Sequence, residues 1–226
     1  MKMKNSIQIA IDGPAGAGKS TIAKIVAEAL GFTYIDTGAM YRAVTYKAIQ
    51  QNIHLDDEEK LADMLAASTI DLKPSAQGQL VFLDGNDVSA EIRSNKVTSS
   101  VSQVAAHAKV RELLVGEQQK LAANGGVVMD GRDIATHVLK NAELKIFMSA
   151  TVEERARRRL IDNQKRGIDA SLEKLQEEIA LRDKKDSERE ASPLVQAEDA
   201  IFLDTTALSI DEAAQAILKL AQERMR

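Results

Sequence analysis

The sequence predicts an α/β fold in which a five-stranded parallel sheet is flanked by helices. Five short apolar segments alternate with longer segments whose apolar residues recur at helical spacing, which is typical of buried parallel strands joined by helices. A glycine-rich motif stands between the first of these strands and the first helix. The length of 226 residues suits one domain with an inserted subdomain.

Each strand of the sheet is predicted from a short apolar run that ends at a turn or helix signal. The first run is rich in isoleucine and ends at a glycine cluster, and the third follows the break at Gly125 and Gly126. The strands are expected at 6–12, 33–36, 127–130, 144–148 and 200–204.

The helices are predicted from apolar residues three and four positions apart. The first, 19–30, ends at Gly31, which is a natural helix stop. The last, 209–225, begins with Ser209 as a cap and Glu212 three positions later, the pattern of a capping box. The other helices are expected at 38–51, 56–68, 96–102, 108–123, 151–164 and 171–185.

Residues 70–88 interrupt the alternation of strands and helices. Short strand-like runs at 70–73, 79–83 and 87–88 are separated by proline, glycine and an Asp-Gly-Asn turn. This pattern predicts a small antiparallel insert.

Composition excludes several classes of protein. The formal net charge is -4, so there is no basic excess and we expect no nucleic-acid polymer as a partner. The sequence has no cysteine, which excludes disulfides and thiolate chemistry and suits a reducing cytoplasm. No apolar run reaches the roughly 20 residues of a membrane span. We therefore expect a cytoplasmic protein without a membrane partner.

The glycine-rich motif fits G-x-x-x-x-G-K-[ST], the phosphate-binding loop of many nucleotide-binding proteins, at every position. In such a loop backbone N–H groups turn toward phosphates, the lysine approaches the β- and γ-phosphates, and the final hydroxyl can bind Mg²⁺. Because a strand precedes the motif and a helix follows it, we interpret it as a nucleotide site in a P-loop NTPase fold and not as an inert turn. Its residues are Gly13, Pro14, Ala15, Gly16, Ala17, Gly18, Lys19 and Ser20.

The rest of the chain favours a kinase for a small molecule over other P-loop classes. A GTPase needs an N-K-x-D motif, and the sequence that begins at Asn95-Lys96 lacks the aspartate and lies in the insert. The chain is also too small for most motor or transport ATPases. Two alternatives stay open: a P-loop kinase for another acceptor such as shikimate or dephospho-coenzyme A, and a nucleotide-gated regulatory module without turnover.

Polar residues after two of the strands predict a second binding site beside the loop. Thr37 and Arg42 follow the second strand, and Arg132 and Asp133 follow the third. Ligands in such sheets bind beyond the carboxyl ends of the strands, where an arginine suits an anionic substrate. Asp130 occupies the position at which many P-loop proteins keep an acid near magnesium. For Thr37 and Arg42 the alternative is a helix start with an exposed arginine, and for 130–133 it is a surface turn with an internal ion pair.

A cluster of arginines in the stretch 155–166 allows two interpretations. The cluster can close over a nucleotide and neutralise charge in the transition state, or it can form a solvated face paired with Glu154 and Asp162. The arginines predicted to share one face are Arg155, Arg158, Arg159 and Arg166.

A second charged group lies near the end of the helix at 171–185. Arg182, Asp186 and Arg189 have the spacing of one helical face, and they can hold a ribose and a phosphate or pair among themselves. The neighbouring charges expected to face solvent are Asp183, Lys184, Lys185 and Glu188. The three histidines, His54, His107 and His137, have no ligand spacing.

Seven segments together resemble the bacterial cytidylate kinase family, in the nucleoside monophosphate kinase group. Their order and spacing are those of the family. The segments are IAIDGPAGAGKST (9–21), DTGAMYRA (36–43), DVSAEIRS (87–94), VSQVAAHAKVRELL (101–114), DGRDIAT (130–136), KIFMSATVEERARRR (145–159) and ASPLV (191–195). One departure is Ala135, where the family often has glycine.

The resemblance implies a transferase that moves the γ-phosphoryl group of ATP to CMP or dCMP with Mg²⁺, in pyrimidine nucleotide metabolism. It implies one domain with a monophosphate-binding region that carries the insert and a helical lid. We expect a monomer, because a core explains the apolar faces of the helices. The expected bounds are 1–36, 108–150 and 190–226 for the core, 37–107 for the monophosphate-binding region and 151–189 for the lid.

Roles carry over from the family by matching position. The cytosine would be read by Ser102, Arg111 and Asp133, and the sugar held by Arg182 and Asp186. The phosphate side would be lined by Thr37, Tyr41, Arg42, Arg132 and Arg189. The catalytic residues would be Lys19, Arg132, Arg155, Arg159 and Arg189, with Ser20 on the metal and Thr21 closing the nucleotide loop.

The cytosine assignment has a physical rationale. A carboxylate accepts a hydrogen bond from the exocyclic amino group, and an arginine donates to N3 or O2. Uracil presents an acceptor in place of the amino group, and a buried pair left unsatisfied costs about 1–3 kcal/mol. We therefore expect discrimination against UMP of at least about tenfold to a hundredfold.

Overall fold

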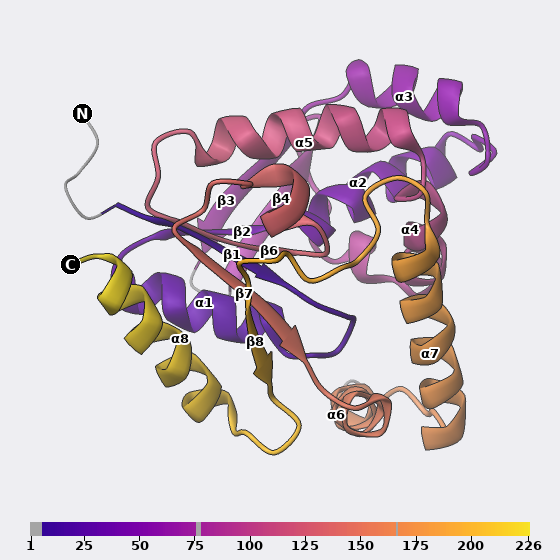
Figure 1. Cartoon of the computed structure of the whole chain (residues 1–226). Helices are drawn as coiled ribbons and strands as arrows, with labels where there is room; N and C mark the ends of the chain where they lie inside the picture. The colour runs from indigo at the N-terminus through magenta and orange to yellow at the C-terminus, as the bar shows by residue number, and fades with distance from the viewer. Residues whose placement is uncertain (1–5, 76–77, 166) are drawn as a thin grey trace.

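The centre of the structure is a parallel sheet. Residues 6–75, 78–165 and 167–226 are described by a computed structural model. Its main strands are β1 (Gln8–Asp12), β2 (Thr33–Asp36), β6 (Val127–Gly131), β7 (Leu144–Ser149) and β8 (Ile201–Asp204). They pair in the order β2-β6-β1-β7-β8, all parallel, so the predicted five-stranded parallel sheet is confirmed (Figure 1).

Helices cover both faces of this sheet. On one face α1 (Lys19–Leu30) and α8 (Ile210–Arg224) pack against β1 and β7, and α5 (Ala108–Ala122) lies on the other face (Figure 1). The remaining α-helices of the described chain are α2 (Thr37–Gln50), α3 (Glu58–Ala66), α4 (Asn95–Val104), α6 (Val152–Lys165) and α7 (Leu172–Glu188).

Strand β6 shows why the central strands are apolar on both sides. Val128 joins the hydrophobic cluster under α1 and α8, whereas Val127 and Met129 join the cluster on the opposite face. A strand that is covered on both faces needs apolar residues without alternation. The charged residues of these strands, Asp12 of β1, Asp36 of β2 and Asp130 of β6, therefore lie at or next to the carboxyl ends of the strands.

The predicted insert is a separate antiparallel sheet. It consists of β3 (Ile70–Ser75), β4 (Gly78–Leu83) and β5 (Asn86–Asp87), in that order. Val81 and Leu83 pack against Ala39 and Ala43 of α2. The side chain of Gln79 links the insert to β2, because it accepts from the Asp36 N–H at 3.0 Å and donates to the Tyr34 carbonyl at 2.7 Å.

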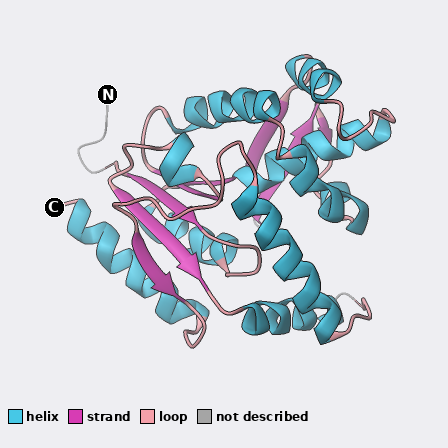
Figure 2. Ribbon diagram, turned by 45° about the vertical axis from the view of Figure 1, so that its right-hand side comes forward, coloured by secondary structure: helices cyan, strands magenta, loops and turns pink. Residues whose placement is uncertain are grey.

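Helices α6 and α7 form a hairpin with a small core of its own. Ala156 of α6 packs with Leu175 and Ile179 of α7 in a cluster that contains no residue of the sheet. Figure 2 shows the hairpin beyond the carboxyl ends of the strands. Few apolar contacts therefore fix the hairpin against the sheet.

Three features differ from the sequence prediction. The π-helical turn Ile134–Val138 and the 3₁₀ turn Glu91–Arg93 were not expected. Helix α7 ends at Glu188, and Arg189 follows it with an extended backbone (φ -64°, ψ 144°). The prediction that Arg189 shares a helical face with Arg182 and Asp186 is therefore wrong.

In the part of the chain that the structure describes, every helix is too short or too polar to cross a membrane.

The capping box of α8 gives a stability prediction. Ser209 accepts from the Glu212 N–H at 3.2 Å, and the Glu212 carboxylate accepts from the Ser209 N–H at 2.9 Å, as the sequence predicts. Ser209→Ala should lower the free energy of unfolding by about 1 kcal/mol, whereas Ser209→Gly, which a helix N-cap tolerates, should cost a few tenths. Urea unfolding followed by circular dichroism measures both, and equal losses would contradict the capping role.

Candidate active site

The glycine-rich loop joins the end of β1 to the start of α1. Gly13 has φ 146°, and a Cβ at that position would lie 1.9 Å from the Met148 carbonyl oxygen. Gly18 begins the helix with φ 89°, which side chains rarely allow. The motif is therefore required by the backbone path of the loop, which presents the N-terminus of α1 to the space beyond β1.

Lys19 is buried inside this loop. Only 6% of the surface of Lys19 is exposed, and its Nζ donates to the Pro14 carbonyl at 2.8 Å. Burial, together with the charge of Arg132, lowers the pKa of Lys19 to about 7. An ammonium group in this position gains most from an anion that approaches the loop.

Asp130, at the end of β6, faces the same loop. Its Oδ2 accepts from the Ser20 hydroxyl at 2.9 Å, and its Oδ1 accepts from the Tyr34 hydroxyl at 2.7 Å. Burial, with Asp36 nearby, raises the pKa of Asp130 to about 6. A hydroxyl beside a carboxylate is the kind of oxygen pair that Mg²⁺ accepts when phosphates and water complete its shell.

No cluster of three or more His, Cys, Asp or Glu residues in the described ranges could hold a metal by itself. The Ser20–Asp130 pair therefore fits Mg²⁺ that arrives with a phosphate ligand, and does not form a complete protein cage.

A cleft of about 440 Å³ brings the predicted residues together at the carboxyl ends of β1, β2 and β6. Thr37 and Arg42, predicted after the second strand, and Arg132 and Asp133, predicted after the third, line the same cleft as the phosphate loop. The predicted site residues on its walls are Ala15, Gly16, Lys19, Ser20, Thr37, Tyr41, Arg42, Ser102, Arg111, Arg132, Asp133, Arg159, Arg182, Asp186 and Arg189. Gly13, Pro14, Ala17, Gly18, Thr21 and Arg155 are not among the residues that line it.

Asp133 lies at one end of this cleft between two arginines. Its Oδ2 pairs with Arg111, and its Oδ1 lies 3.9 Å from Arg189. Arg111 also donates to the Ala105 carbonyl at 2.8 Å and lies over the Tyr41 ring, 5.2 Å from its centre. Since both partners of the Arg111–Asp133 pair are buried, the position of each is fixed by the other.

Asp186 of α7 is a second aspartate that lies between two arginines. Its Oδ2 accepts from Arg132 Nε at 2.9 Å and lies 4.0 Å from Arg182 Nε, and its Oδ1 accepts from the Ser102 hydroxyl at 3.3 Å. Burial opposes the charge on Asp186, but Arg132 and Arg182 outweigh it and hold the pKa of Asp186 below its ordinary value. Burial and Arg132 lower the pKa of Arg182 to about 9.

The walls of the cleft carry more positive than negative charge. Nine Lys or Arg residues and five Asp residues line it. Four buried polar atoms on its walls have no hydrogen-bond partner: Tyr41 Oη, Arg111 Nε, Arg182 Nε and Arg189 Nη2. Buried polar groups in proteins are normally bonded. The surplus of donors and of positive charge therefore fits an anionic ligand that is rich in acceptors.

The arginines of α6 do not act as one face. Arg155 is buried and donates to the Ala150 carbonyl at 2.8 Å and to the Ala15 carbonyl of the loop at 3.0 Å, and it pairs with Asp183 at 2.6 Å. Arg158 pairs with Glu154 at 3.0 Å and donates to the Thr205 carbonyl at 2.6 Å.

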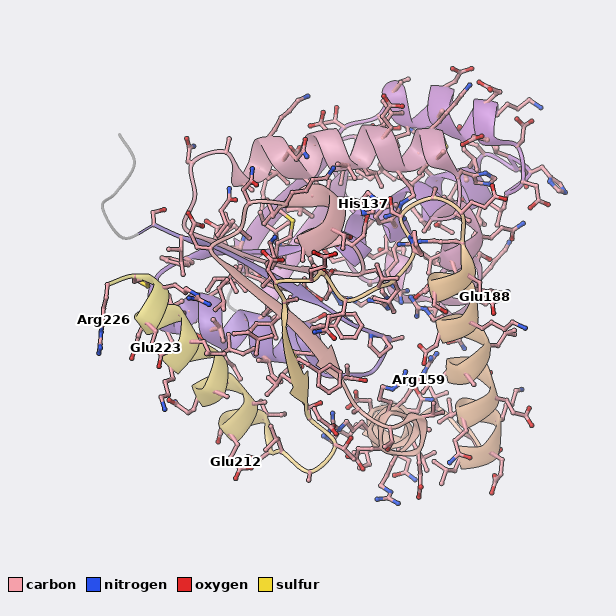
Figure 3. The ribbon with its side chains drawn as sticks, in the orientation of Figure 1. His137, Arg159, Glu188, Glu212, Glu223 and Arg226 are labelled. Atoms are coloured by element: carbon pink, nitrogen blue, oxygen red, sulfur yellow. The ribbon has the colours of Figure 1, made fainter. Side chains whose placement is uncertain are left out.

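Arg159, labelled in Figure 3, lines the cleft. Arg166 lies outside the described residues. The prediction that Asp183 faces solvent is wrong, because its side chain is 23% exposed and partners the buried Arg155.

Sequence reasoning missed two residues that support this site, the hydrogen-bond acceptor Asp12 and the hydrogen-bond donor Tyr34. Asp12 is buried at the end of β1, where its carboxylate accepts from two backbone N–H groups, and burial raises its pKa to about 6. Tyr34 holds Asp130 from the neighbouring strand. A charged residue that closes an otherwise apolar strand was the available signal for Asp12. None of the three histidines is among the lining residues.

Comparison with known proteins decides the family. Residues 9–223 match the family model described as cytidylate kinase. The chain is 92% identical over 223 residues to cytidylate kinase from Lysinibacillus sphaericus, covering 99% of this chain and 100% of the relative. It is 57% identical over 224 residues to cytidylate kinase from Bacillus subtilis, with 99% and 100% covered. The chain belongs to the cytidylate kinase family.

The cytidylate kinase resemblance stated from the sequence is thus confirmed. Among solved structures, an uncharacterized protein from Eubacterium ventriosum superimposes with a TM-score of 0.52 at 14% identity, covering 96% of this chain and 99% of that one. At that identity the likeness shows the fold alone.

The Arg155–Asp183 pair gives a prediction for this member of the cytidylate kinase family. Asp183→Asn leaves the buried guanidinium of Arg155 without its counter-charge, so the free energy of unfolding should fall by about 1–3 kcal/mol. Glu188→Gln is the matched control, because Glu188 forms an exposed pair with Lys184 at 4.0 Å on the same helix, and it should change stability by less than about 0.5 kcal/mol. Similar losses in the two variants, measured by urea unfolding, would contradict a structural role for the Arg155–Asp183 pair.

Proposed function

We propose that the chain transfers the γ-phosphoryl group of ATP to CMP and to dCMP, giving ADP with CDP or dCDP. Family membership supports a CMP kinase that uses ATP. The observation that carries the proposal is the single cleft, which is lined both by Lys19 and Ser20 of the phosphate loop and by Ser102, Arg111 and Asp133. A donor site and an acceptor site in one cavity suit direct transfer between two bound nucleotides.

ATP would occupy the loop, with its phosphates on the backbone N–H groups around residues 13–21 and beside Lys19. Ser20 and Asp130 would hold Mg²⁺, which supplies charge neutralisation on the phosphate oxygens when it is bound. Lys19, Arg132, Arg159 and Arg189 would neutralise the charge on the transferred group. Arg155, by contrast, has donors committed to Ala15, Ala150 and Asp183, and we propose that it supports the loop.

CMP would lie in the remainder of the cleft. Ser102, Arg111 and Asp133 would read the cytosine, because a carboxylate accepts from its amino group and a guanidinium donates to N3 or O2. Arg182 and Asp186 would hold the sugar. The residues around the phosphate would be Thr37, Tyr41, Arg42, Arg132 and Arg189.

The acceptor needs no general base. A phosphate monoester has a second pKa of about 6, so its oxygen is already an anion near neutral pH. The rate would then come from the position of the two phosphates and from the positive charges between them.

The broader assignments are proposals as well. We propose a monomer that works in the cytoplasm, which the absence of cysteine suits. Within it, 37–107 would bind the monophosphate and 151–189 would act as the lid over a core of 1–36, 108–150 and 190–226.

A comparison of acceptors tests the proposal. Purified protein with ATP and Mg²⁺ should form ADP rapidly with CMP and dCMP, and UMP should have a kcat/KM lower by at least about tenfold to a hundredfold. AMP and shikimate serve as further acceptors. Equal or faster turnover with shikimate, AMP or UMP would contradict the substrate assignment, and no turnover with any acceptor would favour a nucleotide-gated module.

Two lysine variants separate a phosphate-binding charge from general charge near the cleft. Lys19→Ala should lower kcat/KM for CMP phosphorylation by at least about a hundredfold, because the ammonium group stabilises charge that develops in the transition state. Lys24→Ala removes the same charge from another residue of the same helix that lines the cleft and should cost less than about fivefold. Comparable losses in a steady-state assay would argue against a specific role for Lys19.

A further inference from the structure

Asp12 links the two halves of the proposed site through its side chain. It is the last residue of β1, its Cα is in register with Gly131 of β6, and Gly13 of the phosphate loop follows it. Its Oδ1 accepts from the Ile134 N–H and its Oδ2 from the Ala135 N–H, both at 2.8 Å. These two groups open the π-helical turn Ile134–Val138, and the side chain of the preceding residue, Asp133, makes no cap there.

This contact holds a short segment at both ends. Gly131 is paired with β1 in the sheet, and Ile134 is tied to Asp12, so Arg132 and Asp133 span a fixed distance. The segment is also tight, because a Cβ on Gly131 would lie 2.6 Å from Ile134 Cδ1 and 2.7 Å from Thr37 Oγ1. The directions of the Arg132 and Asp133 side chains therefore depend on where Asp12 holds the turn.

Those directions matter for the acceptor side of the cleft. Asp133 meets Arg111 and Arg189 there, and Arg132 reaches Asp186 of α7. Without the two hydrogen bonds that they donate to Asp12, the N–H groups of the turn would be unpaired in a buried site, and the turn would shift to satisfy them. A shift of about 1 Å at such a position can cost a hundredfold in rate.

Stability alone does not account for an aspartate at this place. Asp12 is 1% exposed and follows isoleucine and alanine residues in β1, and a buried carboxylate in such a place is costly. The charged groups that act on it are Lys19 and Asp133, one attractive and one repulsive. The two backbone bonds to the turn are the interactions that an apolar residue could not supply.

We propose that Asp12 is a positioning residue, which holds the turn after β6 so that Arg132 and Asp133 face the acceptor nucleotide. The inference rests on the proposed function for the identity of that nucleotide, CMP. Asp12 itself does not line the cleft, so it acts through the turn and not by contact with a substrate.

Asp12→Asn tests this role with a minimal change of shape. One amide oxygen can still accept a hydrogen bond, but the amide nitrogen faces a second N–H donor, so one of the two bonds is lost. We expect KM and the calorimetric Kd for CMP to rise at least about tenfold and kcat to fall. The Kd for ATP, measured without CMP, should change by less than about threefold.

Asp57→Asn is the matched control. Asp57 also accepts from a backbone N–H at a helix start, that of Lys60 at 3.1 Å, but it caps α3 and is not on the walls of the cleft. Its kinetic constants should equal those of the unchanged protein. An equal rise in the Kd for ATP and for CMP in Asp12→Asn, or no rise in either, would overturn the proposal.

Amide hydrogen exchange gives a second readout that needs no substrate and no variant. In the unchanged protein the Ile134 and Ala135 N–H groups should exchange as slowly as those in the middle of β1, although they lie at the start of a short turn. Fast exchange there would overturn the proposal even if Asp12→Asn failed to fold. Failure of the unchanged protein to phosphorylate CMP would count against the proposed function and leave this exchange test intact.

Discussion

Parallel pairing of β1 with β6 and of β6 with β2 is the constraint on which the rest of the molecule depends. Parallel strands end at the same edge of a sheet, so three separate stretches of sequence must place their following residues there. β1 is followed by the phosphate loop, β2 by α2 with Thr37 and Arg42, and β6 by Arg132 and Asp133. The cleft exists because these strand ends meet, and the helices on both faces serve to keep the strands buried.

The same edge collects charges that burial makes costly. Burial is the largest cause of three pKa shifts that favour the neutral form: it lowers the pKa of Lys19 and raises those of Asp12 and Asp130. A protein selected for stability alone would not place them together. An anionic ligand would compensate the positive surplus of the walls, and the unpaired donors there would gain acceptors. Burying these charges therefore costs free energy in the free protein and leaves the site already arranged to bind an anion.

Local patterns in the sequence were sufficient for the sheet, most helices, the insert and the phosphate loop. Apolar runs, helical spacing and the glycine motif are short-range signals, and each corresponds to an observed element. The long-range contacts were not predictable in this way. The turn at 134–138 is held by Asp12, 122 residues earlier. Asp183 is largely shielded from solvent because the α6–α7 hairpin brings it next to Arg155. The cytosine, sugar and phosphate roles of the wall residues came from the family resemblance and stay predictions.

The central claim is that one cleft binds both nucleotides at once, with their phosphates facing each other. A compound in which adenosine and cytidine are joined through five phosphates tests it most directly, by calorimetry and by competition in the presence of Mg²⁺. The account predicts one molecule bound per chain, an affinity above that of either nucleotide alone, and displacement by both ATP and CMP. Displacement by ATP alone, or two molecules bound per chain, would contradict a shared cleft.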